Sequence, residues 1–209
     1  MSKRTDGKFE RRERDFYGTP LTPILRLLPH LSGVDTFAEP MCGDGAIIGP
    51  LEDRGWECKF IADLEPQGDI RKRALTLDVY DVDAAHLEGV DEIISNPPWP
   101  MNAKLRPAGK PDGWPTIDII HHLIQFKPAW MLMAADFMHN VYYQEHLARH
   151  CTDIVSVGRV KWIADSDNTG FDNAAWYRFE RCAETHTRFH GNLGKGVEDM
   201  FHPDIESVL

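Results

Sequence analysis

Residues 34–46 read VDTFAEPMCGDGA, an apolar run that ends in an acid and continues into a turn with two glycines. The run predicts a strand over Val34–Glu39, and the residues after the turn predict a helix over Ala46–Arg54. The turn glycines, Gly43 and Gly45, allow positive φ and a close approach of the backbone to a ligand. A strand, such a turn and a helix, in that order, indicate an α/β fold whose ligands bind beyond the carboxyl ends of the strands.

Short apolar runs and helical patterns alternate along the rest of the chain. This alternation indicates parallel βαβ units and a doubly wound sheet. Near the end, two longer apolar stretches flank the Asp/Asn/Gly-rich turn 165–170, which predicts an antiparallel hairpin. We expect a mostly parallel, seven-stranded α/β sheet that finishes with this hairpin, and an irregular tail after Arg181. The expected helices are 22–31 and 117–126, and the further strands are 59–63, 74–77, 92–96, 130–134, 155–163 and 174–180.

Length and composition fit one globular domain. The chain has 209 residues, of which 42% are hydrophobic and 27% charged, enough to bury a full core. We expect a flexible basic arm over 1–14 and a single domain over 15–209. The apolar runs are too short to span a bilayer, and no secretory signal is expected at the N-terminus. The four cysteines lie far apart without C-x-x-C spacing, which argues against a zinc knuckle or a disulfide framework and fits a reduced cytoplasm.

The net charge of −10 counts at first against a nucleic-acid partner. The charge is unevenly distributed, however. Lys3–Arg14 holds six basic and three acidic residues, whereas Asp63–Glu92 holds nine acidic and three basic ones. An acidic body with local basic contacts would still bind DNA, weakly and with a strong salt dependence.

Acidic residues accompany the glycine turn and follow the next two expected strands. A dinucleotide site would require a third glycine where the chain has Ile48, and Glu39 and Asp44 would repel a pyrophosphate. The turn therefore suits a cationic or zwitterionic ligand better. Asp63 ends the second strand, where a carboxylate can accept hydrogen bonds from both hydroxyls of a ribose, and Asp78 follows the third, where it could accept one from an adenine amino group. Taken singly, each acid is interpreted more readily as a solvated side chain, and the glycine pair can also be an ordinary turn. As an ordered set at successive strand ends, the acids favour a binding site.

The segment Ile93–Trp99, IISNPPW, is the most specific feature of the chain. Its prolines, Pro97 and Pro98, end a strand, fix φ and remove two backbone donors, which leaves a stiff turn that presents carbonyl acceptors. The Asn96 side-chain oxygen and the Pro97 carbonyl could each accept one N–H from an amino group conjugated to a purine ring. Such contacts orient the nitrogen lone pair without a strong general base. Trp99 offers a flat face for stacking a base, worth roughly 1–3 kcal/mol; the alternative is a rigid turn with an aromatic plug.

In these motifs the chain resembles the class I amino-methyltransferases, and most of all small phage or prophage DNA N6-adenine methyltransferases. The resemblance spans about Asp15 to Glu180. Asn96-Pro97-Pro98-Trp99 is similar to the family's catalytic [D/N/S]-P-P-[aromatic] motif, and Asp15-Phe16-Tyr17-Gly18-Thr19-Pro20 to its N-terminal Tyr-x-Thr-Pro segment. The resemblance implies a Rossmann-like fold, S-adenosylmethionine as cofactor and methyl transfer to the N6 of adenine in DNA. The chain departs from the family in its acidic net charge and in lacking a long target-recognition domain, which implies low sequence specificity or recognition by short loops.

The resemblance also assigns site residues. The N-terminal segment contacts the methionine end of the cofactor, the glycine turn wraps its amino acid part, and the acids after the second and third strands hold ribose and adenine. The implied cofactor-binding residues are Tyr17, Thr19, Pro20, Glu39, Pro40, Cys42, Gly43, Gly45, Asp63, Leu64, Asp78, Val79 and Asn96. The implied catalytic residues are Asn96, Pro97, Pro98 and Trp99.

Two further segments are candidates for substrate contact. The loop Pro100–Pro115 directly follows the catalytic motif, and its basic side chains could hold phosphates while its tryptophan stacks or wedges; a solvated loop is the alternative. These loop candidates are Lys104, Arg106, Lys110 and Trp114. A target base in a duplex must be extruded, or the substrate must be single-stranded. Trp162 is similar in position to an aromatic that flanks the target base, and could equally belong to the core.

No metal site is expected. The histidine pairs His146/His150 and His186/His190 are spaced i,i+4, but neither carries the H-E-x-x-H pattern or a well-placed carboxylate.

Three rival functions stay open. An RNA base and a protein glutamine amide are methylated through the same motif, and a silent cofactor-binding module is the rival from another class. The acidic charge favours a protein substrate, whereas the basic arm and the tryptophan-rich loops favour nucleic acid. We expect an enzyme that acts on DNA in the cytoplasm of a bacterial cell or a phage-infected host.

Overall fold

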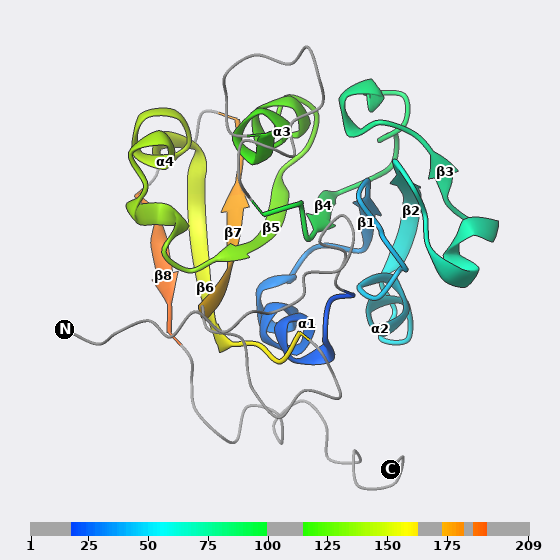
Figure 1. Cartoon of the computed structure of the whole chain (residues 1–209), viewed down its shortest axis with the longest axis horizontal. Coiled ribbons are helices and arrows are strands. Elements are labelled where there is room, and N and C mark those ends of the chain that lie inside the picture. The colour runs from blue at the N-terminus through cyan, green and yellow to red at the C-terminus, as the bar shows by residue number, and fades with distance from the viewer. Residues whose placement is uncertain (1–17, 100–114, 163–172, 182–185, 192–209) are drawn as a thin grey trace, which may run out of the picture.

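The computed structural model describes residues 18–99, 115–162, 173–181 and 186–191 (Figure 1). Within these ranges the chain forms one eight-stranded sheet in the order β3-β2-β1-β4-β5-β7-β6-β8. The strands from β3 to β5 pair in parallel, and β7 runs antiparallel to both β5 and β6. The expected α/β sheet, mostly parallel with a C-terminal antiparallel hairpin, is confirmed.

The bounds of the elements follow the expected order, with ends that shift by a few residues. The strands are β1 (Thr36–Glu39), β2 (Glu57–Asp63), β3 (Leu75–Thr76), β4 (Glu92–Ser95), β5 (Ala129–Ala134), β6 (Cys151–Arg159), β7 (Asn173–Phe179) and β8 (Arg188–His190). The α-helices are α1 (Leu21–Leu27), α2 (Ile48–Glu52), α3 (Pro115–Leu123) and α4 (Val141–His146). The 3₁₀ turns are η2 (Leu28–His30), η3 (Gly68–Lys72), η4 (Val79–Asp81), η6 (Phe137–His139) and η7 (Ala148–His150).

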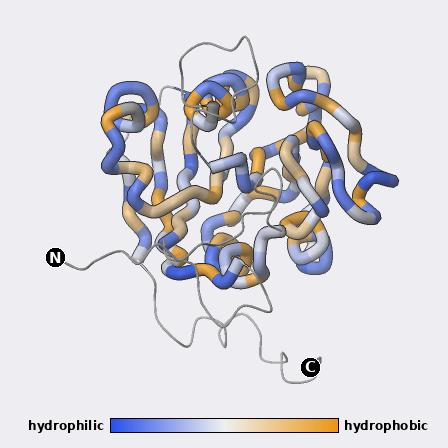
Figure 2. Tube along the Cα trace, viewed as in Figure 1, coloured by the Kyte–Doolittle hydropathy of each residue, from blue (hydrophilic) through white to orange (hydrophobic). Residues whose placement is uncertain are grey.

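The helices cover both faces of the sheet, α3 and α4 on one side and α1 and α2 on the other (Figure 1). Successive residues of a strand point to opposite faces, so a central strand serves two cores. On β5, Met131 and Met133 pack with α3 and α4, whereas Trp130 and Leu132 pack with α1 and α2. Figure 2 shows hydrophobic residues mixed with hydrophilic ones along these helices, as expected for elements with one buried face.

Two expectations about the C-terminal part are wrong. The sheet has eight strands where seven are expected, and the stretch after Arg181 is not wholly irregular, because β8 pairs in parallel with β6. β8 has three residues, and its Arg188 and Phe189 are exposed, so no apolar pattern marks it as a strand. The sixth strand is also displaced: it begins at Cys151 and ends at Arg159, whereas the expected strand is 155–163.

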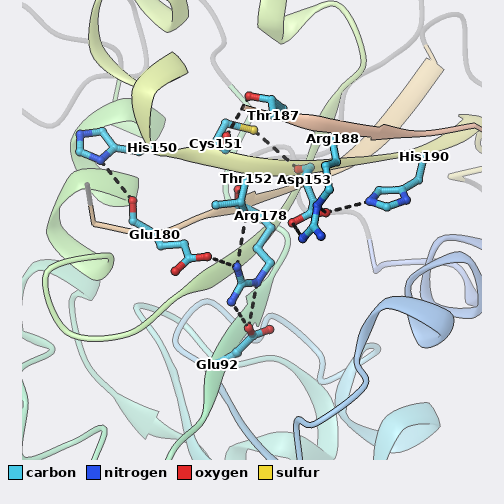
Figure 3. A network of polar contacts seen from close by, with 10 residues as sticks. All are labelled: Glu92, His150, Cys151, Thr152, Asp153, Arg178, Glu180, Thr187, Arg188 and His190. Atoms are coloured by element: carbon cyan, nitrogen blue, oxygen red, sulfur yellow. Dashed lines mark hydrogen bonds and ion pairs between the residues drawn. The ribbon is translucent and has the colours of Figure 1, made fainter. Parts of the chain in front are cut away.

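A network of ion pairs joins β4, β6, β7 and β8 near the amino ends of β4 and β5 (Figure 3). Arg178 donates to Glu92 Oε1 at 2.8 Å from Nε and 2.5 Å from Nη2, and its Nη1 contacts Glu180. The buried Asp153 accepts from Arg188 Nε at 2.9 Å and lies 2.8 Å from His190 Nε2. The network lines a pocket of about 360 Å³ at the edge of the sheet opposite to the carboxyl ends of the parallel strands.

Several expectations fall outside the described residues. They are the basic arm 1–14, the hairpin turn 165–170, Tyr17, Lys104, Arg106, Lys110 and Trp114. In the described ranges, no helix combines the length and the apolar character that crossing a membrane requires.

Candidate active site

The order of the strands brings the two motifs to one place. From β1 the chain proceeds outward through β2 and β3, and then returns to β4 on the other side of β1. The sheet therefore reverses direction between β1 and β4, which is where ligands bind in doubly wound folds. β1 ends at Glu39, next to the glycine turn, and β4 ends at Ser95, next to Asn96.

The glycine turn is fixed against β2 by its backbone. Gly43 and Gly45 have φ of 53° and 79°, which only glycine adopts at low cost. The Gly43 amide donates to Asp63 Oδ2 at 2.8 Å, and the Cys42 amide donates to the Ala62 carbonyl at 2.9 Å. A Cβ at Gly45 would lie 2.9 Å from the Ile70 side chain. The turn therefore has a defined shape that ends beside the acids at the carboxyl edge of the sheet.

The acids at this edge form an electronegative cluster. Glu39 is 2% exposed, and its Oε2 has no hydrogen-bond partner among the described residues. Burial, together with the charges of Asp44 and Asp63, raises the pKa of Glu39 well above its ordinary value. Burial also raises the pKa of Asp63, against the hydrogen bond from Gly43, and burial and Glu39 raise the pKa of Cys42 to about 12. The cluster can receive a cation, and Cys42 is a neutral thiol.

The remaining cofactor candidates continue from this cluster along the edge. Asp63 Oδ1 accepts from the Glu65 amide at 2.7 Å, and Asp78 Oδ1 accepts from the Tyr80 amide at 3.1 Å. Leu64, directly after Asp63, is 68% exposed. Pro40 and Val79 are buried, and Pro20 is half-buried.

Asn96 is held from both ends of its amide. Nδ2 donates to Thr19 Oγ1 at 3.2 Å, and Oδ1 accepts from the Trp99 indole Nε1 at 3.1 Å. The same indole N–H lies 3.0 Å from the Leu132 carbonyl of β5. Pro97 is buried and Pro98 exposed, and the Pro98 carbonyl accepts from the Thr116 hydroxyl at 2.8 Å. The stiff turn expected from the two prolines is thus tied to β5 and α3.

The N-terminal segment connects the two halves of the site. Thr19, which bonds Asn96, follows Gly18, and a Cβ at Gly18 would lie 2.6 Å from Asp44 Oδ2 of the glycine turn. The structure therefore brings Thr19, Asn96 and the acidic turn together. The Asn96–Thr19 bond spans 77 residues, and no local sequence pattern indicates it.

The two tryptophans of the site that lie in the described residues pack against each other. Trp99 and Trp162 are half-buried, and their rings meet edge to face with centroids 5.3 Å apart at 86°. Both pack against the core beneath α1 and α2.

The histidine pairs have unequal surroundings. His146 is exposed while His150 is buried, with its ring centroid 5.5 Å from that of His121. His190 pairs with Asp153 in β6. Across the described residues, no three His, Cys, Asp or Glu side chains are grouped as a metal site would require.

No family model matches the chain, and neither does any curated protein. Several solved structures share its fold. A protein from Listeria monocytogenes, provisionally described as a class I S-adenosylmethionine-dependent methyltransferase, superposes with a TM-score of 0.56 at 13% identity over 88% of this chain and 68% of that one. A protein from Pyrococcus horikoshii, provisionally described as an RNA methyltransferase, gives 0.52 at 16% identity over 83% of this chain and 91% of that one.

A chain of a type I restriction–modification system gives a TM-score of 0.53 at 15% identity. The match covers 90% of this chain and 47% of the other, so this protein spans about half of that chain's length. At these identities the likeness concerns the fold. The fold is the Rossmann-like one of the class I methyltransferases, and β8 lies at one edge of its sheet.

Proposed function

We propose that the protein transfers a methyl group from S-adenosylmethionine to an exocyclic amino nitrogen, and that the physiological acceptor is the N6 of adenine in DNA. The observation that carries this proposal is the fixed Asn96 amide, bonded through Thr19 to the segment that reaches the acidic glycine turn. An amine-orienting group and a cation-accepting cluster, side by side, are what this reaction requires.

The acids fit the methionine and ribose parts of the cofactor. Glu39 Oε2 is a buried acceptor without a partner in the part of the chain that the structure describes, and the α-ammonium of S-adenosylmethionine would supply both a hydrogen bond and the opposite charge. Each oxygen of Asp63 already accepts one backbone N–H, and a carboxylate has about four acceptor sites, so capacity remains for two ribose hydroxyls. Leu64 and Val79 would offer apolar contact to the adenine, and the Asp78 carboxylate would accept a hydrogen bond from its amino group.

The residues of the motif act on the acceptor amine. When bound, the cofactor supplies an electrophilic methyl group on a sulfonium sulfur. Asn96 Oδ1 has two lone pairs, of which Trp99 occupies one, so the second can accept an N–H of the amine while the Pro97 carbonyl accepts the other N–H. The nitrogen lone pair is then directed at the methyl carbon. The new C–N bond would replace the C–S bond of the methyl donor, which would leave as a neutral thioether, and one N–H proton of the amine would pass to water.

DNA as the substrate rests on the sequence. Six basic residues in Lys3–Arg14 and the basic loop after Trp99 supply phosphate contacts, and the net charge of −10 makes the expected binding weak and salt-dependent. The same fold occurs in a chain of a type I restriction–modification system and in a protein described as an RNA methyltransferase, so both nucleic acids belong in the test.

The test is methyl transfer from labelled S-adenosylmethionine to DNA, RNA and protein extracts, with nucleoside mass spectrometry of DNA from cells that express the protein. We expect N6-methyladenine with the wild type and a loss of about 100-fold or more with Asn96→Ala, as for the removal of a transition-state hydrogen bond. Calorimetry should find the cofactor bound by both proteins. If the labelled methyl group appears only in RNA or only in protein, DNA is not the substrate and that other polymer is. Unchanged methyl transfer by Asn96→Ala would refute the catalytic assignment of Asn96.

A further inference from the structure

The amide of Asn96 has two chemically opposite ends, and only one of them can orient an amine. Its oxygen accepts hydrogen bonds, whereas its NH₂ group donates them and would repel the N–H groups of an amino substrate. A half-turn of the side chain exchanges these two ends at little steric cost. The productive orientation must therefore be imposed by a neighbour.

The two neighbours of Asn96 differ in what they can impose. Thr19 Oγ1, at 3.2 Å from Nδ2, is a hydroxyl that donates or accepts and would adapt to either orientation. The Trp99 indole Nε1–H, at 3.1 Å from Oδ1, only donates and tolerates only an acceptor. Trp99 thus selects the orientation in which the oxygen faces it and the NH₂ group faces Thr19.

Trp99 is itself held in place. Its N–H is shared with the Leu132 carbonyl at 3.0 Å, on a β5 residue that is fully buried and pairs with Trp176 of β7. The edge-to-face contact with Trp162 fixes the plane of the ring. An indole tied to the backbone of a central strand is a rigid reference for the amide.

We infer that Trp99 is a positioning residue: its indole N–H locks the Asn96 amide with the oxygen available to an amine, and so selects nitrogen acceptors that carry N–H groups. The inference rests on the proposed function and adds a role to the ring stacking that the sequence motif alone suggests. Stacking requires only a flat ring, whereas this role requires the N–H.

Trp99→Phe separates the two roles because it keeps an aromatic ring and removes the N–H. We expect kcat to fall about 10-fold, the value of one net hydrogen bond, while KM for the polynucleotide and the Kd for S-adenosylmethionine stay within about twofold. Trp56→Phe is the matched control, because Trp56 is half-buried beside the amino end of β2, away from Asp63. Its kinetics should equal those of the wild type.

Nuclear magnetic resonance gives a readout that does not depend on turnover. In wild-type protein with ¹⁵N-labelled tryptophan and asparagine, the proton of the Trp99 indole N–H should exchange slowly with solvent. In Asn96→Ala, the resonance of this N–H should change its chemical shift. The Asn96 NH₂ signals should be sharp in the wild type and Trp56→Phe, and broadened by flipping in Trp99→Phe.

The outcomes separate the two proposals. If the wild type binds no S-adenosylmethionine and methylates no acceptor, the proposed function fails and this role falls with it. If the wild type methylates DNA and Trp99→Phe raises KM while leaving kcat and the Asn96 signals unchanged, the function stands and Trp99 acts by stacking alone.

Discussion

Glu39 combines deep burial of a carboxyl group with two neighbouring acids. Its carboxyl is buried beside Asp44 and Asp63, and these surroundings raise its pKa, so the free protein keeps it neutral over a wider pH range than an exposed glutamate. A ligand ammonium favours the ionised form. Cofactor binding should therefore expel a proton, and the affinity should rise with pH until the raised pKa is passed.

Glu39→Gln tests this linkage because glutamine keeps the shape and cannot ionise. We expect the affinity for S-adenosylmethionine to fall about 10- to 100-fold at pH 8, the value of a hydrogen bond to a charged group, and to lose its pH dependence. Calorimetry in buffers of different ionisation enthalpy measures both the affinity and the proton release. The exposed Glu88→Gln is the control. Equal affinity and equal proton release in Glu39→Gln and the wild type would exclude an ammonium partner for Glu39.

At the scale of residues, the sequence predicted where the candidate site residues lie along the sheet, but not the orientation or the partners of their side chains. Glu39, Asp63 and Asp78 lie at or just after the ends of β1, β2 and β3, as their spacing indicates, because parallel strands end at a common edge. The bond from Asn96 to Thr19 depends on packing between segments that are distant in the chain. The Glu39 oxygen that lacks a partner among the described residues depends on the whole neighbourhood. Their roles in the reaction stay predictions.

At the scale of elements, the backbone pairing of β8 is accompanied by ion pairs and hydrogen bonds from its side chains. It has three residues, on the outer side of β6, and two of its three side chains bind Asp153. Although burial alone would raise it, hydrogen bonds from His190 and Arg188 lower the pKa of Asp153. At pH values above the ordinary aspartate pKa, the ionised Asp153 therefore stabilises the folded protein. This stabilisation is lost as the pH falls through the lowered pKa of the folded state.

Asp153→Asn should release β8 and leave the rest of the sheet intact. The neutral amide has no charge for the Arg188 guanidinium and one acceptor oxygen in place of two, so we expect a loss of about 1–3 kcal/mol in unfolding free energy. Hydrogen exchange should become faster at Arg188–His190 and stay unchanged in β1 and β4. Asp81→Asn, at an exposed acid of η4, should change neither quantity. Unchanged exchange at β8 in Asp153→Asn would mean that backbone pairing alone holds the strand.

For the molecule as a whole, the alternation of strands and helices sufficed to predict the doubly wound sheet and its hairpin. Central strands such as β5 are buried on both faces, and in the sequence they are therefore continuous apolar runs. The sequence did not indicate β8 or α4, because β8 is short and exposed and α4 is a six-residue helix. Short peripheral elements are stabilised by contacts with the rest of the fold, which local patterns do not contain.

The stability of the whole molecule should depend on three histidines in acid solution. Burial, and then nearby cations or histidines, lower the pKa values of His30 and His121, and burial lowers that of His150 against the Glu180 carbonyl. Each histidine is therefore easier to protonate in the unfolded chain. The contribution of the neutral histidine to folding stability is fully present at pH values above 6.5, the ordinary histidine pKa. It is lost as the pH falls through the lowered pKa of the folded state.

The buried acids Glu39 and Asp63 act in the opposite sense, because their raised pKa values make protonation favourable to folding. The effect of the histidines is therefore measured as the difference in Tm between a histidine variant and the wild type. His121 packs against His146 and His150, so His121→Gln removes one charge that acid would add to this cluster. The Tm of His121→Gln minus the Tm of the wild type should increase by a few degrees when the pH is lowered from 7.5 to 5.5. The exposed His139→Gln should show no such change, and parallel Tm curves for all three proteins would show that protonation of the cluster costs the fold nothing.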